Sequence, residues 1–241
     1  MDPALIVTGA SMLAGSVAAV SGFGIGSILT PVLTLWWDTK LAVALVAIPH
    51  VSGTALRLWL LRRQIDRRVL WSFGAASAAG GLVGAWLHLQ LSSPSLRMML
   101  ASLLVFAGLM GLTGLTDRLR FHGGAAWLAG VFSGLLGGLV GNQGGIRTAA
   151  MLGLDVPKDA FIATTTAVAL IIDAVRTPVY LAAYAKALSS RIPWISLMTL
   201  GVLAGTMIGY LMLKRLPESS FRRMVSGLIL SLGLFLFLRG K

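Results

Sequence analysis

The sequence contains no cysteine and few charged residues. Without cysteine among its 241 residues, the chain has no disulfide, no thiolate metal ligand and no cysteine nucleophile. Asp, Glu, Lys and Arg together make up 12% of the chain, and only eight residues are acidic. So few charges leave most helices without the polar face that a helix of a soluble protein exposes to water.

Hydrophobic residues make up 56% of the sequence and fall in long runs. Runs of roughly 18–23 apolar residues are long enough to cross a hydrocarbon core of about 30 Å as helices. We therefore predict an all-α polytopic membrane protein without a soluble domain. Its net charge of +12 then reflects basic loops beside anionic lipid rather than nucleic-acid binding. The expected apolar segments are 4–36, 40–61, 69–90, 96–115, 122–153, 158–184, 192–213 and 220–238.

A weak internal repeat predicts two related halves, 1–118 and 119–241. Chance identity among common residues is the alternative, but the matches keep their order along the chain and include charged residues. Nine residues of the first half recur in the second at offsets of 118 to 125: Gly26, Ile28, Thr30, Lys40, Arg57, Gly80, Gly84, Arg97 and Met99.

The first segment of each half has an awkward length. About 32 residues form a straight helix of roughly 48 Å, which exceeds one crossing and falls short of two. Glycine and polar residues interrupt the middle of each, as "SGFGIGS" in the first half and "GNQGG" in the second. Each segment is therefore either one long tilted helix or two half-helices that enter the membrane and return.

The charges of the loops favour the returning hairpin. In that arrangement one side of the membrane collects eleven Lys and Arg and the other six, whereas eight full crossings give ten and seven. Basic residues concentrate on the cytoplasmic side. The most basic loop also moves between the halves, from "RRQIDRR" after the second segment to "KRLPESSFRR" after the third. We therefore predict two inverted repeats, each a broken or re-entrant helical hairpin plus three transmembrane helices, an architecture typical of secondary transporters.

Two motif pairs carry a resemblance to a known family. "SGFGIGSILTPVL" precedes "AVALVAIPHVSGTALRLWLLRRQID", and "SGLLGGLVGNQGGIRTAAMLGL" precedes "AFIATTTAVALIIDAVRTPVYL". This duplicated pattern resembles the sulfite exporter TauE/SafE family, also called the toluene-sulfonate uptake permeases, over nearly the whole chain. The resemblance implies transport of small sulfur-containing anions such as sulfite or organosulfonates.

The second break contains the main candidates for substrate binding. Unwound backbone at membrane depth is tolerated where it is buried in protein or lines a cavity, and half-helix N-termini there favour an anion. Arg147 follows the break, and its guanidinium suits an oxyanion because it donates paired hydrogen bonds. Asn142 and Gln143 either hold the anion or cap the half-helices. Gly24 and Gly144, one at each break, complete this group.

Other polar residues inside spans have both a functional and a structural interpretation. Asp173 and Arg176 can pair at i, i+3, either as a neutral structural pair or as a site of proton coupling. Arg57 is expected to extend its guanidinium to the membrane interface. His50 and Thr165 are candidate ligands, although buried histidines are often structural and threonines often bond their own backbone.

We find no catalytic motif, so we predict no enzymatic activity, no cofactor and no metal site. The expected function is a secondary transporter in the bacterial inner membrane that moves small sulfur-containing anions by alternating access. A passive anion channel, or a transporter of another small organic anion, is the alternative. The expected partners are the anion and membrane lipid, and a homo-oligomer is left open.

Overall fold

The structure, a computed structural model, describes residues 2–115, 124–142, 144, 147, 151, 158–212 and 218–239, and these residues are predominantly helical. Within them, six helices are long and apolar enough to cross a membrane. The prediction of an all-α polytopic membrane protein is confirmed. The elements are α1 (Pro3–Ser21), α2 (Ile25–Leu33), α3 (Thr39–Leu61), the 3-10 helix η1 (Arg62–Gln64), α4 (Arg67–Gln90), α5 (Ser93–Thr113), α6 (Gly124–Val140), α8 (Lys158–Ala183), α9 (Ala185–Ser189), α10 (Ile192–Met212) and α11 (Glu218–Leu238).

Three of the few acidic residues begin helices. The Asp2 carboxylate accepts a hydrogen bond from the Ala4 amide at 2.9 Å, and Asp38 and Asp66 cap α3 and α4 in the same way. Such caps satisfy amides that have no partner in a preceding turn. These carboxylates are therefore used at helix ends, away from the middle of the spans.

Both long apolar segments break near their middle. The helix α1 ends before Gly22, which has a φ of 81°, and α2 begins after Gly24, which has a φ of 140°. The helix α6 ends at Val140 and is followed by Gly141, which has a φ of 71°. Positive φ is accessible to glycine at little cost. The alternative of one continuous tilted helix is therefore wrong for both segments.

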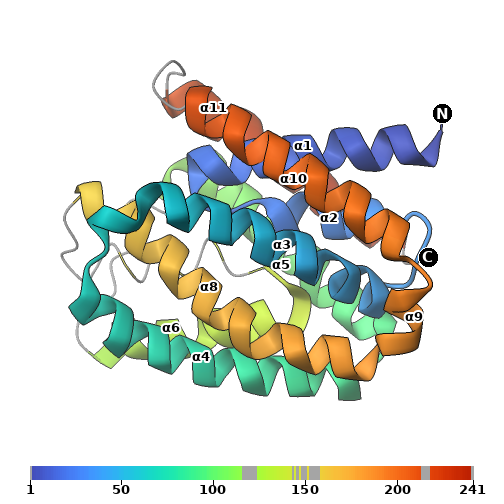
Figure 1. Ribbon diagram of the computed structural model, residues 1–241, viewed down its shortest axis with the longest axis horizontal. Helices are drawn as coiled ribbons and strands as arrows, with labels where there is room; N and C mark the ends of the chain where they lie inside the picture. The colour runs from blue at the N-terminus through green and yellow to red at the C-terminus, as the bar shows by residue number, and fades with distance from the viewer. Residues whose placement is uncertain are drawn as a thin grey trace.

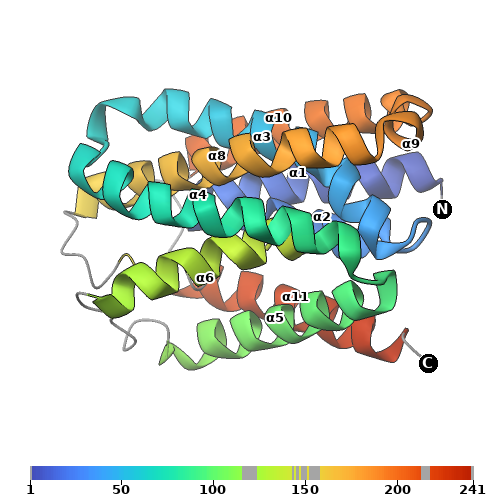
Figure 2. The same ribbon diagram turned by 90° about the horizontal axis from the view of Figure 1, so that it is seen from below.

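The first broken segment returns to the end of the molecule where it began. Figures 1 and 2 both place the N-terminus and the connection between α2 and α3 at one end of the helices, together with α9. The connection between α3 and α4 lies at the opposite end. This arrangement matches the re-entrant hairpin that the loop charges favour.

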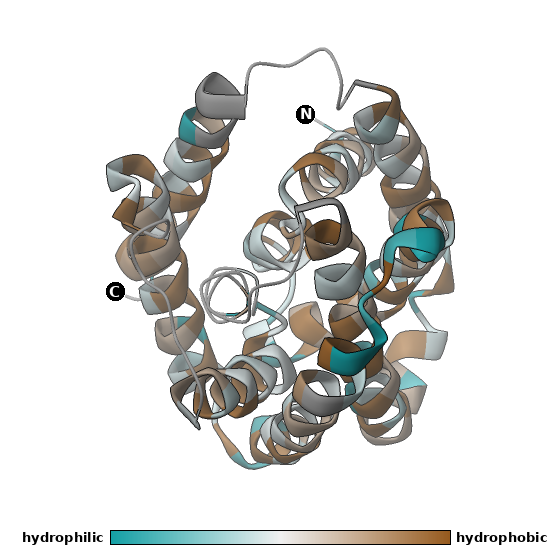
Figure 3. Ribbon diagram, turned by 90° about the vertical axis from the view of Figure 1, so that its left-hand side faces the viewer, coloured by the Kyte–Doolittle hydropathy of each residue, from teal (hydrophilic) through white to brown (hydrophobic). Residues whose placement is uncertain are grey.

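The ends of the helices have the composition of membrane interfaces. Exposed arginines, Arg62, Arg63, Arg67 and Arg68, gather at the connection between α3 and α4, which appears as hydrophilic colour in Figure 3. We call this the basic end. Every tryptophan lies in a connection or within about two turns of a helix end. Tryptophan at both ends of a helical bundle is typical of aromatic belts, which indicates that the helices run across the bilayer.

Glycines bring the helices into close contact. A Cβ atom on Gly205 of α10 would lie 2.0 Å from the carbonyl oxygen of Met12 in α1, and one on Gly80 of α4 would lie 2.1 Å from that of Val131 in α6. Small residues permit such backbone contacts between membrane helices. These glycines therefore let α1 pack closely against α10, and α4 against α6.

The residues of these two contacts are separated by offsets that also occur in the sequence repeat. Val131 follows Met12 by 119 residues, and Gly205 follows Gly80 by 125, as in the sequence repeat. The helix α1 thus packs against α10, and α6 packs against α4.

Candidate functional site

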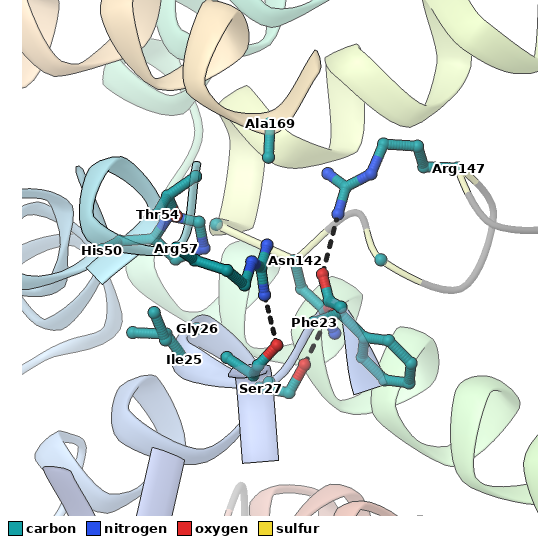
Figure 4. Close-up of a pocket in the computed structure, with 15 residues that line it drawn as sticks. Phe23, Ile25, Gly26, Ser27, His50, Thr54, Arg57, Asn142, Arg147 and Ala169 are labelled. Atoms are coloured by element: carbon teal, nitrogen blue, oxygen red, sulfur yellow. Dashed lines mark hydrogen bonds between the residues drawn. The ribbon is translucent and has the colours of Figure 1, made fainter. Parts of the chain in front are cut away.

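A pocket lies where the two breaks meet. Its walls come from the end of α1, the start of α2, the middle of α3, the second break and α8 (Figure 4). Its cavity volume of about 20 Å³ has room for about one water molecule. A larger solute therefore requires the lining residues to move slightly apart.

The two breaks are in direct contact. A Cβ atom on Gly26 would lie 2.2 Å from the carbonyl oxygen of Gly141, and one on Gly144 would lie 2.1 Å from the Cβ of Phe23. The Ser27 hydroxyl donates a hydrogen bond of 3.1 Å to the Asn142 side-chain oxygen. Larger residues at these two glycines would therefore push the breaks apart and change the pocket.

Both N-terminal and C-terminal ends of helices face this region. The helix α2 begins at the pocket, and Gly24 provides no side chain to cap its first amides. These amides and the positive end of the helix dipole favour an anion. The opposite ends of α1 and α6 present carbonyl oxygens, which attract cations.

Arginines occupy those carbonyl ends. Arg57 donates to the Ala18 oxygen, and Arg147 Nη2 donates to the Gly22 oxygen at 3.3 Å. Arg176 Nη1 donates to the Gly137 oxygen at 2.8 Å. Each guanidinium is thus fixed at the last turn of a half-helix, or immediately after it, beside the break.

Arg57 does not extend to the membrane interface, and that expectation is wrong. Its side chain is buried and lines the pocket, because the end of α1 packs against α3 and offers the Ala18 carbonyl. Only the tertiary contact between these helices makes that partner available. The charge of Arg57 therefore adds to the site.

The two pocket arginines keep free donors. Arg57 and Arg147 are 4% and 2% exposed. Arg57 Nε and the Nε and Nη1 of Arg147 have no hydrogen-bond partner among the residues that the structure describes. Figure 4 shows both guanidinium groups directed toward the space between the breaks. None of the described residues that line the pocket is acidic, so its walls carry two positive charges.

A second group of charges lies between α3 and α8. Asp173 accepts a hydrogen bond of 2.8 Å from Arg176 Nε, and Nη2 lies 2.8 Å from the same carboxylate oxygen, so the two residues form an ion pair. The other carboxylate oxygen lies 2.7 Å from His50 Nδ1. His50 also lines the pocket, whereas Asp173 and Arg176 do not. The histidine therefore links the ion pair to the pocket.

The structure brings together most of the candidates from the sequence. Gly24, His50, Asn142, Gly144 and Arg147 all line the pocket. Gln143 lies outside the described residues. Sequence reasoning missed Thr54 and Arg57 as pocket residues, although Arg57 had one signal, its match to Arg176 in the repeat.

Thr165 does not line this pocket. Its hydroxyl donates to the sulfur of Met151 at 3.3 Å, and the side chain is buried within the helices. The neighbouring Thr164 accepts a hydrogen bond from the Asp66 amide, and Thr166 bonds the backbone of its own helix. The threonine cluster thus has structural partners, and we leave it out of the candidate site.

No sequence among the curated proteins matches this chain. The family model described as sulfite exporter TauE/SafE matches residues 7–236, which include both breaks and every described pocket residue. The match covers nearly the whole chain, and the helices and pocket described above provide its structural setting. The chain belongs to the sulfite exporter TauE/SafE family of membrane transporters.

Proposed function

We propose that this protein carries a small sulfur oxyanion, such as sulfite or an organosulfonate, across the bacterial inner membrane. The anion binds in the pocket between the two breaks. The observation that carries the proposal is the pair of buried arginines with free N–H groups. An acid to neutralise them is lacking among the described lining residues.

The free energy of buried charge supports an anionic ligand. A buried charge without a counter-ion is costly, and two of the same sign increase the cost. The carbonyls of Ala18 and Gly22 compensate part of this cost. A bound anion supplies the rest, because guanidinium groups donate paired, charge-assisted hydrogen bonds to oxyanions.

Neutral donors add to the same site. The first amides of α2 face the pocket, and Ser27 and Thr54 line it. A tetrahedral or pyramidal oxyanion has several oxygens that point in different directions. Donors from two arginines, a helix N-terminus and hydroxyl groups surround such a ligand better than a planar or cationic one.

We infer further that transport proceeds by alternating access between two inverted repeats, 1–118 and 119–241. The exchanged glycine contacts of α1 with α10 and of α6 with α4 support this arrangement. The basic loops support opposite orientation of the halves. A pocket at the contact of two repeats opens to either side when one repeat rocks against the other.

Flux in proteoliposomes tests this function. Vesicles with purified protein should take up sulfite and methanesulfonate with saturable kinetics, and sulfate or small carboxylates should compete according to their fit. Uptake that never saturates, together with measurable single-channel conductance, would instead identify the passive channel. No flux of any sulfur oxyanion, with flux of another solute class, would refute the proposed substrate.

A further inference from the structure

The helices α3 and α8 carry equivalent arginines. Arg57 and Arg176 are 119 residues apart, and so are the Ala18 and Gly137 carbonyls to which their Nη1 atoms donate. Each guanidinium therefore takes the same place relative to its own half-helix. The two halves offer two copies of one arginine site.

The two copies differ at one neighbouring position. Three residues before Arg176 stands Asp173, whose carboxylate accepts a hydrogen bond from Nε and forms an ion pair with the guanidinium. Three residues before Arg57 stands Thr54, a neutral residue that lines the pocket. Arg57 Nε is buried and has no partner among the residues that the structure describes. The second copy contains its own anion, and the first lacks one.

We propose that Arg57 and Thr54 form the subsite for one oxygen of the transported anion, which binds Arg57 Nε as the Asp173 carboxylate binds Arg176. This inference rests on the proposed function and specifies where the ligand binds. The contact of Asp173 with Arg176 in the second half shows how a ligand oxygen would contact Arg57 in the first half. A ligand with several oxygens on one atom, as in sulfite, sulfinate or sulfonate groups, suits this subsite, because one oxygen binds Arg57 while the others remain available to donors elsewhere in the pocket.

Neighbouring groups fit this subsite. The Thr54 hydroxyl lies 3.4 Å from His50 Nδ1, which in turn contacts Asp173. The hydroxyl is free to rotate and donate to an anion oxygen. Arg147, on the other side of the pocket, is available for a second oxygen.

The substitution Thr54→Asp tests the inference, because it would give the first half its own carboxylate. That carboxylate would pair with Arg57 at i, i+3 and repel the ligand. Thr54→Asn is the matched control, since the amide has the shape of Asp without its charge. Isothermal titration with sulfite and with methanesulfonate should show at least about a tenfold weaker affinity for Thr54→Asp than for Thr54→Asn. Thr54→Asp should also melt at or above the temperature of the control, since its buried arginine is paired.

The outcomes separate the two proposals. If the wild type binds neither anion, the proposed function fails. If the wild type binds and both Thr54 variants bind alike, the subsite is wrong while the function stands. If Thr54→Asp does not fold, the variant Arg57→Gln is used instead. A loss of affinity of about tenfold or more in Arg57→Gln supports the subsite. Unchanged affinity in Arg57→Gln overturns it.

Discussion

The substitution Asp173→Asn removes the counter-ion of a fully buried arginine. Asp173 is 0% exposed and Arg176 is 1% exposed, and they form an ion pair with a hydrogen bond of 2.8 Å from Arg176 Nε. Breaking a buried ion pair by removing one partner costs about 3–5 kcal/mol, because the remaining charge is left uncompensated. The bond of 2.7 Å to His50 is weakened at the same time. We expect a loss near the upper part of that range.

Unfolding in mixed detergent, with increasing SDS, measures this free energy. The double variant Asp173→Asn/Arg176→Gln removes both charges and should recover at least about 1 kcal/mol relative to the single variant, since contacting residues are not additive. A cost below about 1 kcal/mol for Asp173→Asn, or additivity of the two changes, would refute the reasoning that the pair is buried and mutually neutralising.

Two further predictions concern the packing and the topology. Gly205→Ala places a methyl group 2.0 Å from the Met12 carbonyl oxygen and should lower stability by about 1–3 kcal/mol in the same detergent assay, whereas Gly9→Ala, which meets open space, should not. Because the chain has no cysteine, Gln64→Cys and Gln90→Cys report separately on the two ends of the bundle. An impermeant thiol reagent applied to intact cells should label Gln90→Cys and spare Gln64→Cys, which the basic loops place in the cytoplasm; the reverse pattern would contradict the orientation.

Apolar runs and charged interruptions were enough to predict the spans. The expected segment 40–61 becomes α3, Thr39–Leu61, and 192–213 becomes α10, Ile192–Met212. Charged residues mark where such helices leave the membrane, so the boundaries are local properties of the sequence. Glycines in the middle of a long apolar run likewise mark where a helix can break.

The partners within the site were not local and could not be predicted in the same way. His50 and Asp173 are 123 residues apart and meet only because α3 packs against α8. Arg57 lies close to the end of its span in sequence, which favours the membrane interface, but the carbonyl end of α1 holds it inside. The i, i+3 spacing of Asp173 and Arg176, by contrast, already allowed their pairing to be foreseen.

Comparing equivalent positions in the two halves shows differences in charge that no single site residue shows by itself. Comparing Thr54 with Asp173 shows a charge present in one half and missing from the other. That difference acquires a meaning only when the structure places both arginines on equivalent carbonyls. The asymmetry between similar halves is therefore the feature that points to the ligand.

Anion binding to purified protein tests the central claim most directly. Titration of sulfite into the wild type, into Arg147→Gln and into the control Arg63→Gln, which changes an exposed arginine at the basic end, compares the pocket with the surface. We predict that Arg147→Gln binds about tenfold or more weakly, because a charge-assisted hydrogen bond contributes about 1.5–3 kcal/mol, while Arg63→Gln binds like the wild type. Equal affinity for all three proteins would contradict an anion site between the two breaks.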